Sequence, residues 1–257
     1  MIENIIKVDM KNKYRRHILR ISVGIIVCIL LLTGSALGAS FKLPVTVNGA
    51  GFERTDKPVD VSVDFTQLLN SIGQSGTIDE NSIYVAETNN LWSVIDTSVP
   101  FQFDKDSGYN STTKASGTIV FIMKGTTTSS ENRYYYIYFN TGGSSTPISV
   151  TPQMSLTDNV IDEGMSSYKI SNNKGIFYFQ KAAGGFSSWN DTSNNDWIGW
   201  NNKSSIGSAG KYRGIPNAVN PEGIFHPGFY CCTNTVVSEG PIKIRIKSVN
   251  GTSWESI

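Results

Sequence analysis

The chain has 257 residues, with 22 Lys and Arg, 21 Asp and Glu, and only three Cys. Residues 1–38 hold six of the basic and two of the acidic residues, so the remainder carries 16 against 19, a net charge of −3. Nucleic acid is therefore excluded as an expected partner, because no basic excess is left to neutralise a phosphate backbone. The two adjacent Cys after the leader provide no disulfide framework.

Residues 1–39 are predicted to be a signal peptide or a membrane anchor. A basic stretch is followed by the apolar run 21–32 and then by small residues, the layout of a secretory leader cleaved after Gly38 or Ala39. The alternative is an uncleaved anchor, since the 19 residues from Ile21 to Ala39 are long enough to span a bilayer. Either way the rest of the chain is expected to be secreted or at the cell surface, with membrane contact only through this segment.

The residues after the leader predict an all-β fold of many short strands, arranged as two β-sandwich units. In VDVSVDF, residues 59–65, Val and Phe alternate with polar residues, as in a strand with one buried face. DFTQLLNSIGQSG predicts one short helix, because apolar residues from Phe65 to Ile72 lie at helical spacing and Gly73 would end it. Later strands are expected in SIYVAE, GTIVFIMKG, RYYYIYFNTGG and GPIKIRIKS, which are rich in β-branched and aromatic residues.

A run rich in Gly, Ser, Thr and Pro follows Phe139 and marks a domain boundary. We expect an N-terminal β-sandwich at 41–147, a linker at 148–164 and a second β unit at 165–257. The second unit has roughly 90 residues, which would make a thin core for a two-sheet sandwich. A hairpin turn at Asn250-Gly251 should also deliver a return strand that has barely started at the last residue. This unit is therefore expected to be the first part of a longer β domain.

Three segments of the second unit carry a resemblance to a known family. They read KGIFYFQKAAGGFSSWNDTSNNDWIGWN, YRGIPNAVNPEGIFHPG and VSEGPIKIRIKSVNGTSWE. Together they resemble the opening of a galactose-mutarotase-like β-supersandwich of extracellular polysaccharide lyases and glycoside-processing enzymes. The first unit, with ERTDKPVDVSVDFTQLL and VPFQFD, is similar to the smaller β-sandwich that often precedes it. The resemblance implies a protein that engages polysaccharide, with an incomplete supersandwich as its second unit.

The loop YRGIPNAVNPEGIFHPGF, residues 212–229, holds the candidate catalytic residues. Its three Pro and three Gly restrict the backbone and exclude a helix. A lyase acting on a uronic acid must neutralise the carboxylate, abstract the C5 proton and protonate the leaving oxygen. Arg213 or Asn217 could neutralise the carboxylate, His226 could be the base, and Tyr212 could donate the proton.

The same loop also has a structural interpretation, in which Arg213 pairs with Glu222 and His226 hydrogen-bonds the backbone. Glu222 is otherwise a candidate for substrate binding. A metal site needs three converging ligands, and adjacent Cys are an uncommon addition to His226 and Glu222. No cofactor is therefore expected, although Ca²⁺ at oxygen ligands such as Asp191 and Asp196 stays open.

Trp189, Trp197 and Trp200 are the second set of substrate-binding candidates. Flat aromatic faces stack on pyranose rings, and the neighbouring Asn and Asp could bond sugar hydroxyls. The alternative is that these Trp fill the core, with one of Trp197 and Trp200 pointing inward and a bulge at Gly199. RYYYIYF is a weaker candidate, in which alternate Tyr share one face and both faces could be packed.

Three functions remain open on these observations. The leading hypothesis is an exported protein that binds polysaccharide or is a catalytically incomplete glycan-active enzyme. The alternatives are a uronate-polysaccharide lyase and a structural cell-envelope protein. N-glycosylation sequons, which an exported chain could use, begin at Asn110, Asn190, Asn202 and Asn250.

Overall fold

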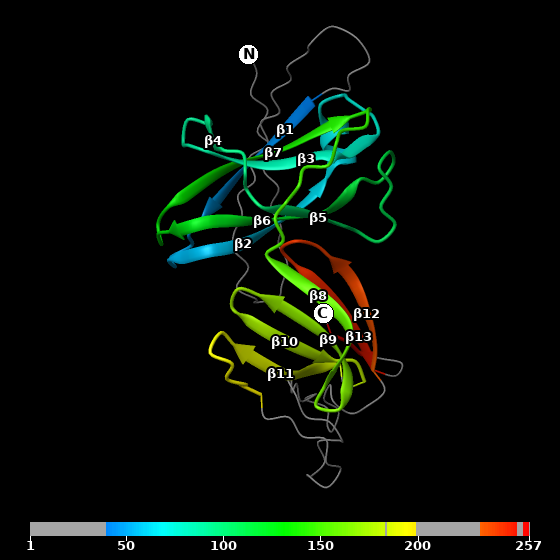
Figure 1. The fold of residues 1–257 in the computed structure, drawn as a ribbon. Coiled ribbons are helices and arrows are strands. Elements are labelled where there is room, and N and C mark those ends of the chain that lie inside the picture. The colour runs from blue at the N-terminus through cyan, green and yellow to red at the C-terminus, as the bar shows by residue number, and fades with distance from the viewer. Residues whose placement is uncertain (1–39, 183, 199–231, 251–253, 257) are drawn as a thin grey trace. The chain divides into compact units, whose positions relative to one another are not determined.

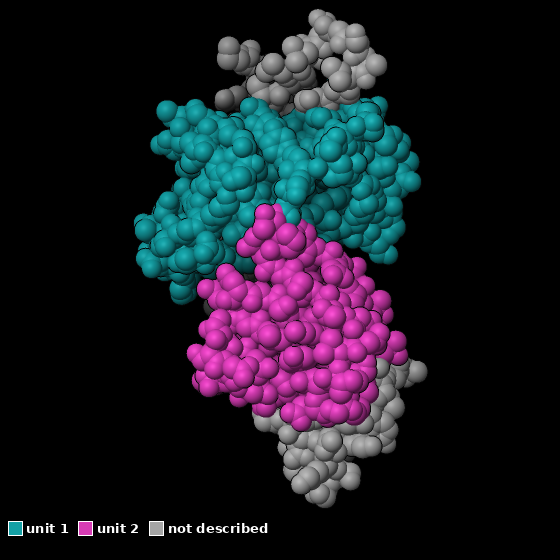
Figure 2. Space-filling model, in the orientation of Figure 1, with its two compact units in different colours: residues 1–150 teal, residues 151–257 magenta. Residues whose placement is uncertain are grey.

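The computed structural model describes residues 40–182, 184–198, 232–250 and 254–256 (Figure 1). The expected leader at 1–39 and the candidate catalytic loop at 212–229 lie outside these residues. The chain divides into two compact units, residues 1–150 and 151–257, coloured teal and magenta in Figure 2. In the described ranges no helix is long and apolar enough to cross a membrane.

Unit 1 is a sandwich of two antiparallel sheets. One sheet has the strand order β1-β7-β3-β4 and the other has the order β2-β6-β5. Strands that are neighbours in the first sheet lie far apart in the sequence, since β7 pairs with both β1 and β3. The strands are β1 (Ser40–Asn48), β2 (Arg54–Asp64), β3 (Ile78–Thr88), β4 (Val94–Asp96), β5 (Phe101–Lys105), β6 (Ser116–Thr127) and β7 (Asn132–Thr141).

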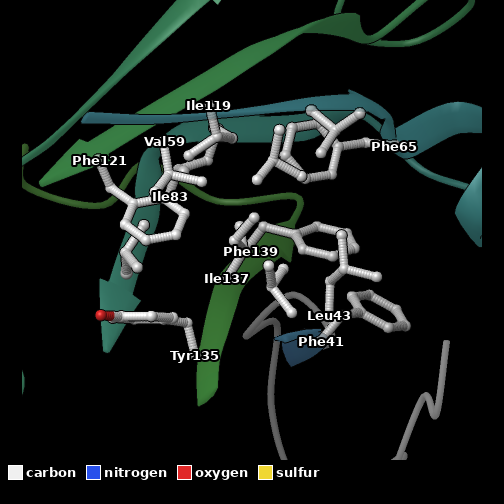
Figure 3. Packing of buried hydrophobic residues seen from close by; sticks show 14 of the residues in the cluster. Phe41, Leu43, Val59, Phe65, Ile83, Ile119, Phe121, Tyr135, Ile137 and Phe139 are labelled. Carbon is white, nitrogen blue, oxygen red and sulfur yellow. The ribbon is translucent and has the colours of Figure 1, made fainter. Parts of the chain in front are cut away.

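The core of unit 1 lies between its two sheets, where apolar side chains from both inner faces interdigitate (Figure 3). In β2 the expected alternation is confirmed, because its three Val are buried and the intervening side chains are exposed. In β7 the residues Tyr135, Ile137 and Phe139 face the core. The rings of Phe121 and Tyr135, from different sheets, have centroids 4.7 Å apart. The hydrophobic effect over this interface is the main force that holds the two sheets together.

The predicted helix is confirmed as α1, Phe65–Ser71, which connects β2 to β3. The Asp64 carboxylate accepts a hydrogen bond from the Gln67 backbone N–H at 3.0 Å and so caps the first turn. Phe65 and Leu69 are buried in the core, which fixes the helix against the sandwich. Gly73 follows with a φ of +70°, a conformation that suits the end of a helix.

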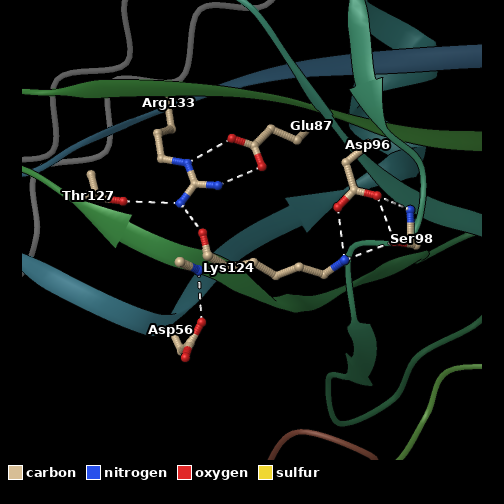
Figure 4. Close-up of polar contacts among 8 residues, drawn as sticks. Asp56, Glu87, Asp96, Ser98, Lys124, Thr127 and Arg133 are labelled. Atoms are coloured by element: carbon tan, nitrogen blue, oxygen red, sulfur yellow. Dashed lines mark hydrogen bonds and ion pairs between the residues drawn. The ribbon is translucent and has the colours of Figure 1, made fainter.

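A polar cluster joins the two sheets at one edge of the sandwich (Figure 4). Arg133 of β7 donates two hydrogen bonds, 2.7 and 2.6 Å long, to the carboxylate of Glu87 on β3. The same guanidinium donates to the Lys124 carbonyl oxygen of β6 at 2.5 Å. Lys124 in turn forms an ion pair of 2.8 Å with Asp96 of β4. The bond from Arg133 to the Lys124 carbonyl oxygen and the Lys124–Asp96 pair therefore tie the first sheet to β6 of the second, whereas the Arg133–Glu87 pair joins two strands of the first sheet.

Unit 2 also consists of antiparallel strands, in one sheet of order β11-β10-β9-β8 and one of order β12-β13-β14. Fewer large side chains are fully buried here than in unit 1 among the described residues. The all-β prediction is thus confirmed for the part of the chain that the structure describes. The strands are β8 (Met154–Asp162), β9 (Met165–Asn172), β10 (Gly175–Gln180), β11 (Gly185–Asp191), β12 (Cys232–Glu239), β13 (Ile244–Asn250) and β14 (Trp254–Ser256).

The structure corrects the expected linker at 148–164. Residues 154–162 form β8, which pairs with β9 from Met154 opposite Asn172 to Asp162 opposite Met165. The sequence hides this strand because β8 is at the edge of its sheet and is rich in exposed polar residues. The expected return strand after Asn250 is present as β14.

Candidate functional site

Two of the three candidate Trp are brought together by a hairpin at the end of β11. The strand reaches Asp191, the chain turns, and Asn190 and Asp196 then pair in an isolated antiparallel bridge. Next to this bridge the Trp197 backbone N–H donates to the Trp189 carbonyl oxygen at 3.0 Å. Residues that lie directly opposite in an antiparallel pair have side chains on the same face. Trp189 and Trp197 therefore lie on one face of this hairpin.

Asp191 fixes both the turn and one of the Trp side chains. Its Oδ1 accepts the backbone N–H groups of Ser193 and Asn195 at 2.8 and 2.9 Å. Its Oδ2 accepts the Asn195 side-chain amide at 3.0 Å and the Trp197 indole N–H at 2.9 Å. The Trp197 ring is thereby held at one end while most of its surface is exposed.

The hydrogen bonds around Asp191 keep its carboxyl group charged. The bond from the Asn195 side chain, followed by those from the Asn195 backbone and the Trp197 indole, lowers the pKa of Asp191 to about 2. A carboxylate is therefore present beside the Trp197 ring at neutral pH. This local negative charge disfavours an anionic ligand at this hairpin.

Asp196 supports the neighbouring part of the hairpin. Its Oδ1 accepts the backbone N–H of Trp189 at 2.9 Å and that of Ile198 at 3.0 Å. These bonds hold Trp189 and the residues after the turn in a fixed geometry. Asp196 thus has a positioning role that the sequence pattern did not reveal.

The exposure of the two Trp bears on the alternative that they fill the core. Trp197 is 69% exposed and Trp189 is 43% exposed, whereas Ile198, which lies between Trp197 and Trp200 in the sequence, is buried. Trp189 packs edge-on against Phe177 of β10, with ring centroids 5.2 Å apart. The core alternative is therefore wrong for Trp197, and Ile198 is the residue that points inward. Trp200 lies outside the described residues.

Among the described residues, the candidate Ca²⁺ ligands Asp191 and Asp196 do not belong to a cluster of metal-ligating side chains. Both oxygens of Asp191 accept two hydrogen bonds each, and Oδ1 of Asp196 accepts two more. Such oxygens are engaged by N–H donors and are poorly placed to serve as cation ligands. In the part of the chain that the structure describes, no group of three or more His, Cys, Asp or Glu converges as a metal site.

Several of the other candidate residues are not in the described part of the structure. Tyr212, Arg213, Asn217, Glu222 and His226 lie outside the described residues, and so does the sequon residue Asn202.

Two of the sequons can be compared. Asn110 is exposed in a loop, where its Oδ1 accepts the backbone N–H groups of Thr112 and Thr113. Asn190 is half-buried in β11, and its backbone pairs with Ile176. Asn110 is thus the better placed acceptor for a glycan. The side chain of Asn250 lies outside the described part of the structure.

The sequence analysis missed the role of Asp191 as the anchor of the Trp197 ring. The run NDTSNND contains the signal, because an Asp ahead of Ser and Asn favours a turn in which its carboxylate accepts backbone N–H groups. What that signal does not reveal is the indole bond, which depends on the chain returning beside β11.

Comparison of the chain with protein-family models, with curated proteins and with solved structures finds no match. The resemblance to polysaccharide lyase-like supersandwich proteins therefore stays a prediction.

Proposed function

We propose that the protein is an exported polysaccharide-binding protein and that Trp189 and Trp197 form its sugar platform. The observation that carries this proposal is the Trp197 ring, which is 69% exposed yet held at its indole N–H by Asp191. Exposing a large aromatic ring to water forgoes the stabilisation that its burial would contribute. A fixed and exposed aromatic ring is what a pyranose requires for stacking.

Preorganisation supports a binding role for this ring. A side chain that is already held in one orientation loses little rotamer entropy when a ligand binds. The hydrogen bonds of Asp191 and Asp196 supply that rigidity without burying either Trp. The exposed Trp197 ring lies beside the Asp191 carboxylate, an arrangement that suits the apolar face of a neutral sugar ring and its hydroxyl groups.

The test is calorimetric titration of the purified chain with neutral hexasaccharides such as cellohexaose and maltohexaose. Trp197→Ala is expected to weaken binding by about 1–3 kcal/mol, by analogy with nucleic-acid bases that stack on aromatic side chains, with an unchanged melting temperature. Phe52→Ala is the matched control, because Phe52 is also an exposed aromatic residue but lies in unit 1. Equal binding by Trp197→Ala and the unmodified chain would refute the platform and favour a structural envelope protein.

The uronate lyase alternative rests on residues 212–229 and stays a prediction. It makes a different claim, since it requires cleavage and not only binding. Release of unsaturated products from a uronate polymer, lost in His226→Gln, would support it.

A further inference from the structure

The outer face of the sheet β1-β7-β3-β4 carries a continuous layer of aromatic side chains. In β7 the residues Tyr134, Tyr136 and Tyr138 point away from the core residues between them. Tyr138 lies opposite Tyr84 of β3, and their rings stack in parallel with centroids 4.5 Å apart. Trp92, from the loop between β3 and β4, packs on Tyr134 and Tyr136 at 5.4 and 5.1 Å. We call these five residues the tyrosine face.

Trp92 reaches this layer from a strained backbone position. It has a φ of +62°, which Gly or Asn adopts far more readily than an aromatic residue. In unit 2, the corresponding position of the turn after Asp191 is held by Asn194, also with a φ of +62°. The chain therefore places a Trp where its turn favours Asn. Strain of this kind at an aromatic residue on a surface points to a use for the side chain.

The loop around Trp92 is built to hold that position. The Asn89 side-chain oxygen accepts the backbone N–H groups of Leu91 and Ser93 at 2.9 and 3.0 Å. The Trp92 backbone N–H donates to the Asn89 carbonyl oxygen at 3.0 Å. The ring is thus oriented by its own turn as well as by the two Tyr beneath it.

The charge placed on the tyrosine face is positive. The Lys42 ammonium of β1 lies 4.2 Å from the centroid of the Tyr136 ring. The same four strands carry four acidic residues, and each is engaged by a partner outside the tyrosine face. These residues are Asp79, Glu80, Glu87 and Asp96, and their partners are Ser145, Lys105, Arg133 and Lys124, respectively. An anionic ligand would therefore meet a cation and no competing carboxylate among these described residues.

We propose that the tyrosine face is a second glycan-binding surface and that it takes a polysaccharide strand bearing carboxylates. The Trp92 ring stacks on a pyranose, the hydroxyl groups of Tyr84 and Tyr138 bond the sugar edge, and Lys42 pairs with a uronate carboxylate. This inference rests on the proposed polysaccharide binding for its ligand class. It differs from the Trp197 platform in charge, since a cation and not a carboxylate accompanies the aromatic residues.

The experiment titrates the purified chain with a uronic acid hexamer, an oligogalacturonate, and with the neutral cellohexaose and maltohexaose. Trp92→Asn is expected to weaken hexamer binding about tenfold or more, because Asn suits the backbone position but offers no ring. Lys42→Gln keeps all the Tyr and is expected to reduce the preference for the acidic hexamer about tenfold. Neither change should alter binding of the neutral hexasaccharides. A double variant, Leu91→Ser with Ile95→Ser, is the control, because both residues are exposed next to Trp92 but outside the layer.

The two proposals fail in different ways. Unchanged hexamer binding in both Trp92→Asn and Lys42→Gln, or no binding of the hexamer by the unmodified chain, would overturn the tyrosine face alone. Equal loss in the Leu91→Ser, Ile95→Ser control would also overturn it, by showing an apolar contact with a protein partner or a disturbed loop. Trp197→Ala should leave binding of the uronic acid hexamer unchanged. Loss of hexamer binding in Trp197→Ala would assign all binding to unit 2 and would overturn the tyrosine face. If Trp92→Asn does not fold, Lys42→Gln decides the matter by itself.

Discussion

Asn89 in unit 1 and Asp191 in unit 2 occupy equivalent positions in two hairpin turns of the same kind. In each, the backbone N–H donates to the carbonyl oxygen four residues later, at 2.9 Å to Ser93 and at 3.1 Å to Asn195. In each, Oδ1 accepts the backbone N–H groups of the second and fourth residues that follow. Such three-residue loops favour a left-handed residue before the return strand. The two turns differ in that one acceptor is an amide and the other a carboxylate.

This difference predicts that acid releases Trp197 but not Trp92. The pKa of Asp191 is lowered to about 2, chiefly by the Asn195 side chain, from a value near 3.8. A lowered pKa means that the contribution of the carboxylate is fully present above about pH 4 and is lost as the pH falls through about 2. The indole N–H resonance of Trp197 should therefore stay constant from neutral pH to about pH 4 and shift near pH 2.

Asp191→Asn supplies the control for this titration. Asn keeps an acceptor oxygen in the same place, as Asn89 does, but cannot titrate. The Trp197 resonance should then be independent of pH across the same range. A shift with a midpoint above pH 4 in the unmodified chain would contradict the assigned role of the carboxylate.

The Arg133–Glu87 pair is expected to be important for the stability of unit 1. Its side chains are only 11% and 13% exposed, so removal of one partner leaves a charge that water hardly reaches. Glu87→Ala should lower the free energy of unfolding by about 3 kcal/mol, measured by urea unfolding. Lys105→Gln is the matched control. Its pair with Glu80 is much more exposed, so the loss should be below about 1 kcal/mol. Equal losses would show that burial does not set the cost.

The Tyr135 hydroxyl predicts a stabilising substitution. It is buried at the edge of the core and has no hydrogen-bond partner among the described residues (Figure 3). Burial raises the pKa of this phenol well above its ordinary value, so the group stays neutral. Tyr135→Phe removes an unsatisfied polar atom and should raise the free energy of unfolding by about 1 kcal/mol. Tyr138→Phe, on the half-buried outer face, should change it by less than about 0.5 kcal/mol. Destabilisation by Tyr135→Phe would show that the hydroxyl is bonded.

Local sequence patterns determined a large part of this fold. The alternation of Val residues in β2 shows which side chains enter the core, and the alternation in β7 divides its residues between two faces, because successive residues of a strand point to opposite faces. Asp64 and Gly73 bound α1 through their own backbone contacts and conformation. Each of these features depends on neighbours within a few residues, so it can be read along the chain.

The tertiary structure decided the features that depend on distant segments. β8 is a strand because β9 supplies its hydrogen-bond partners, although its own residues are mostly polar and exposed. Tyr84 and Tyr138 are 54 positions apart in the printed sequence and meet only because β3 pairs with β7 in one register. Trp197 meets Asp191 because the chain returns along β11 after its turn. Periodicity shows which face of a strand a residue occupies, whereas its neighbours on that face are set by strand pairing, which is determined by the packing of the whole sandwich.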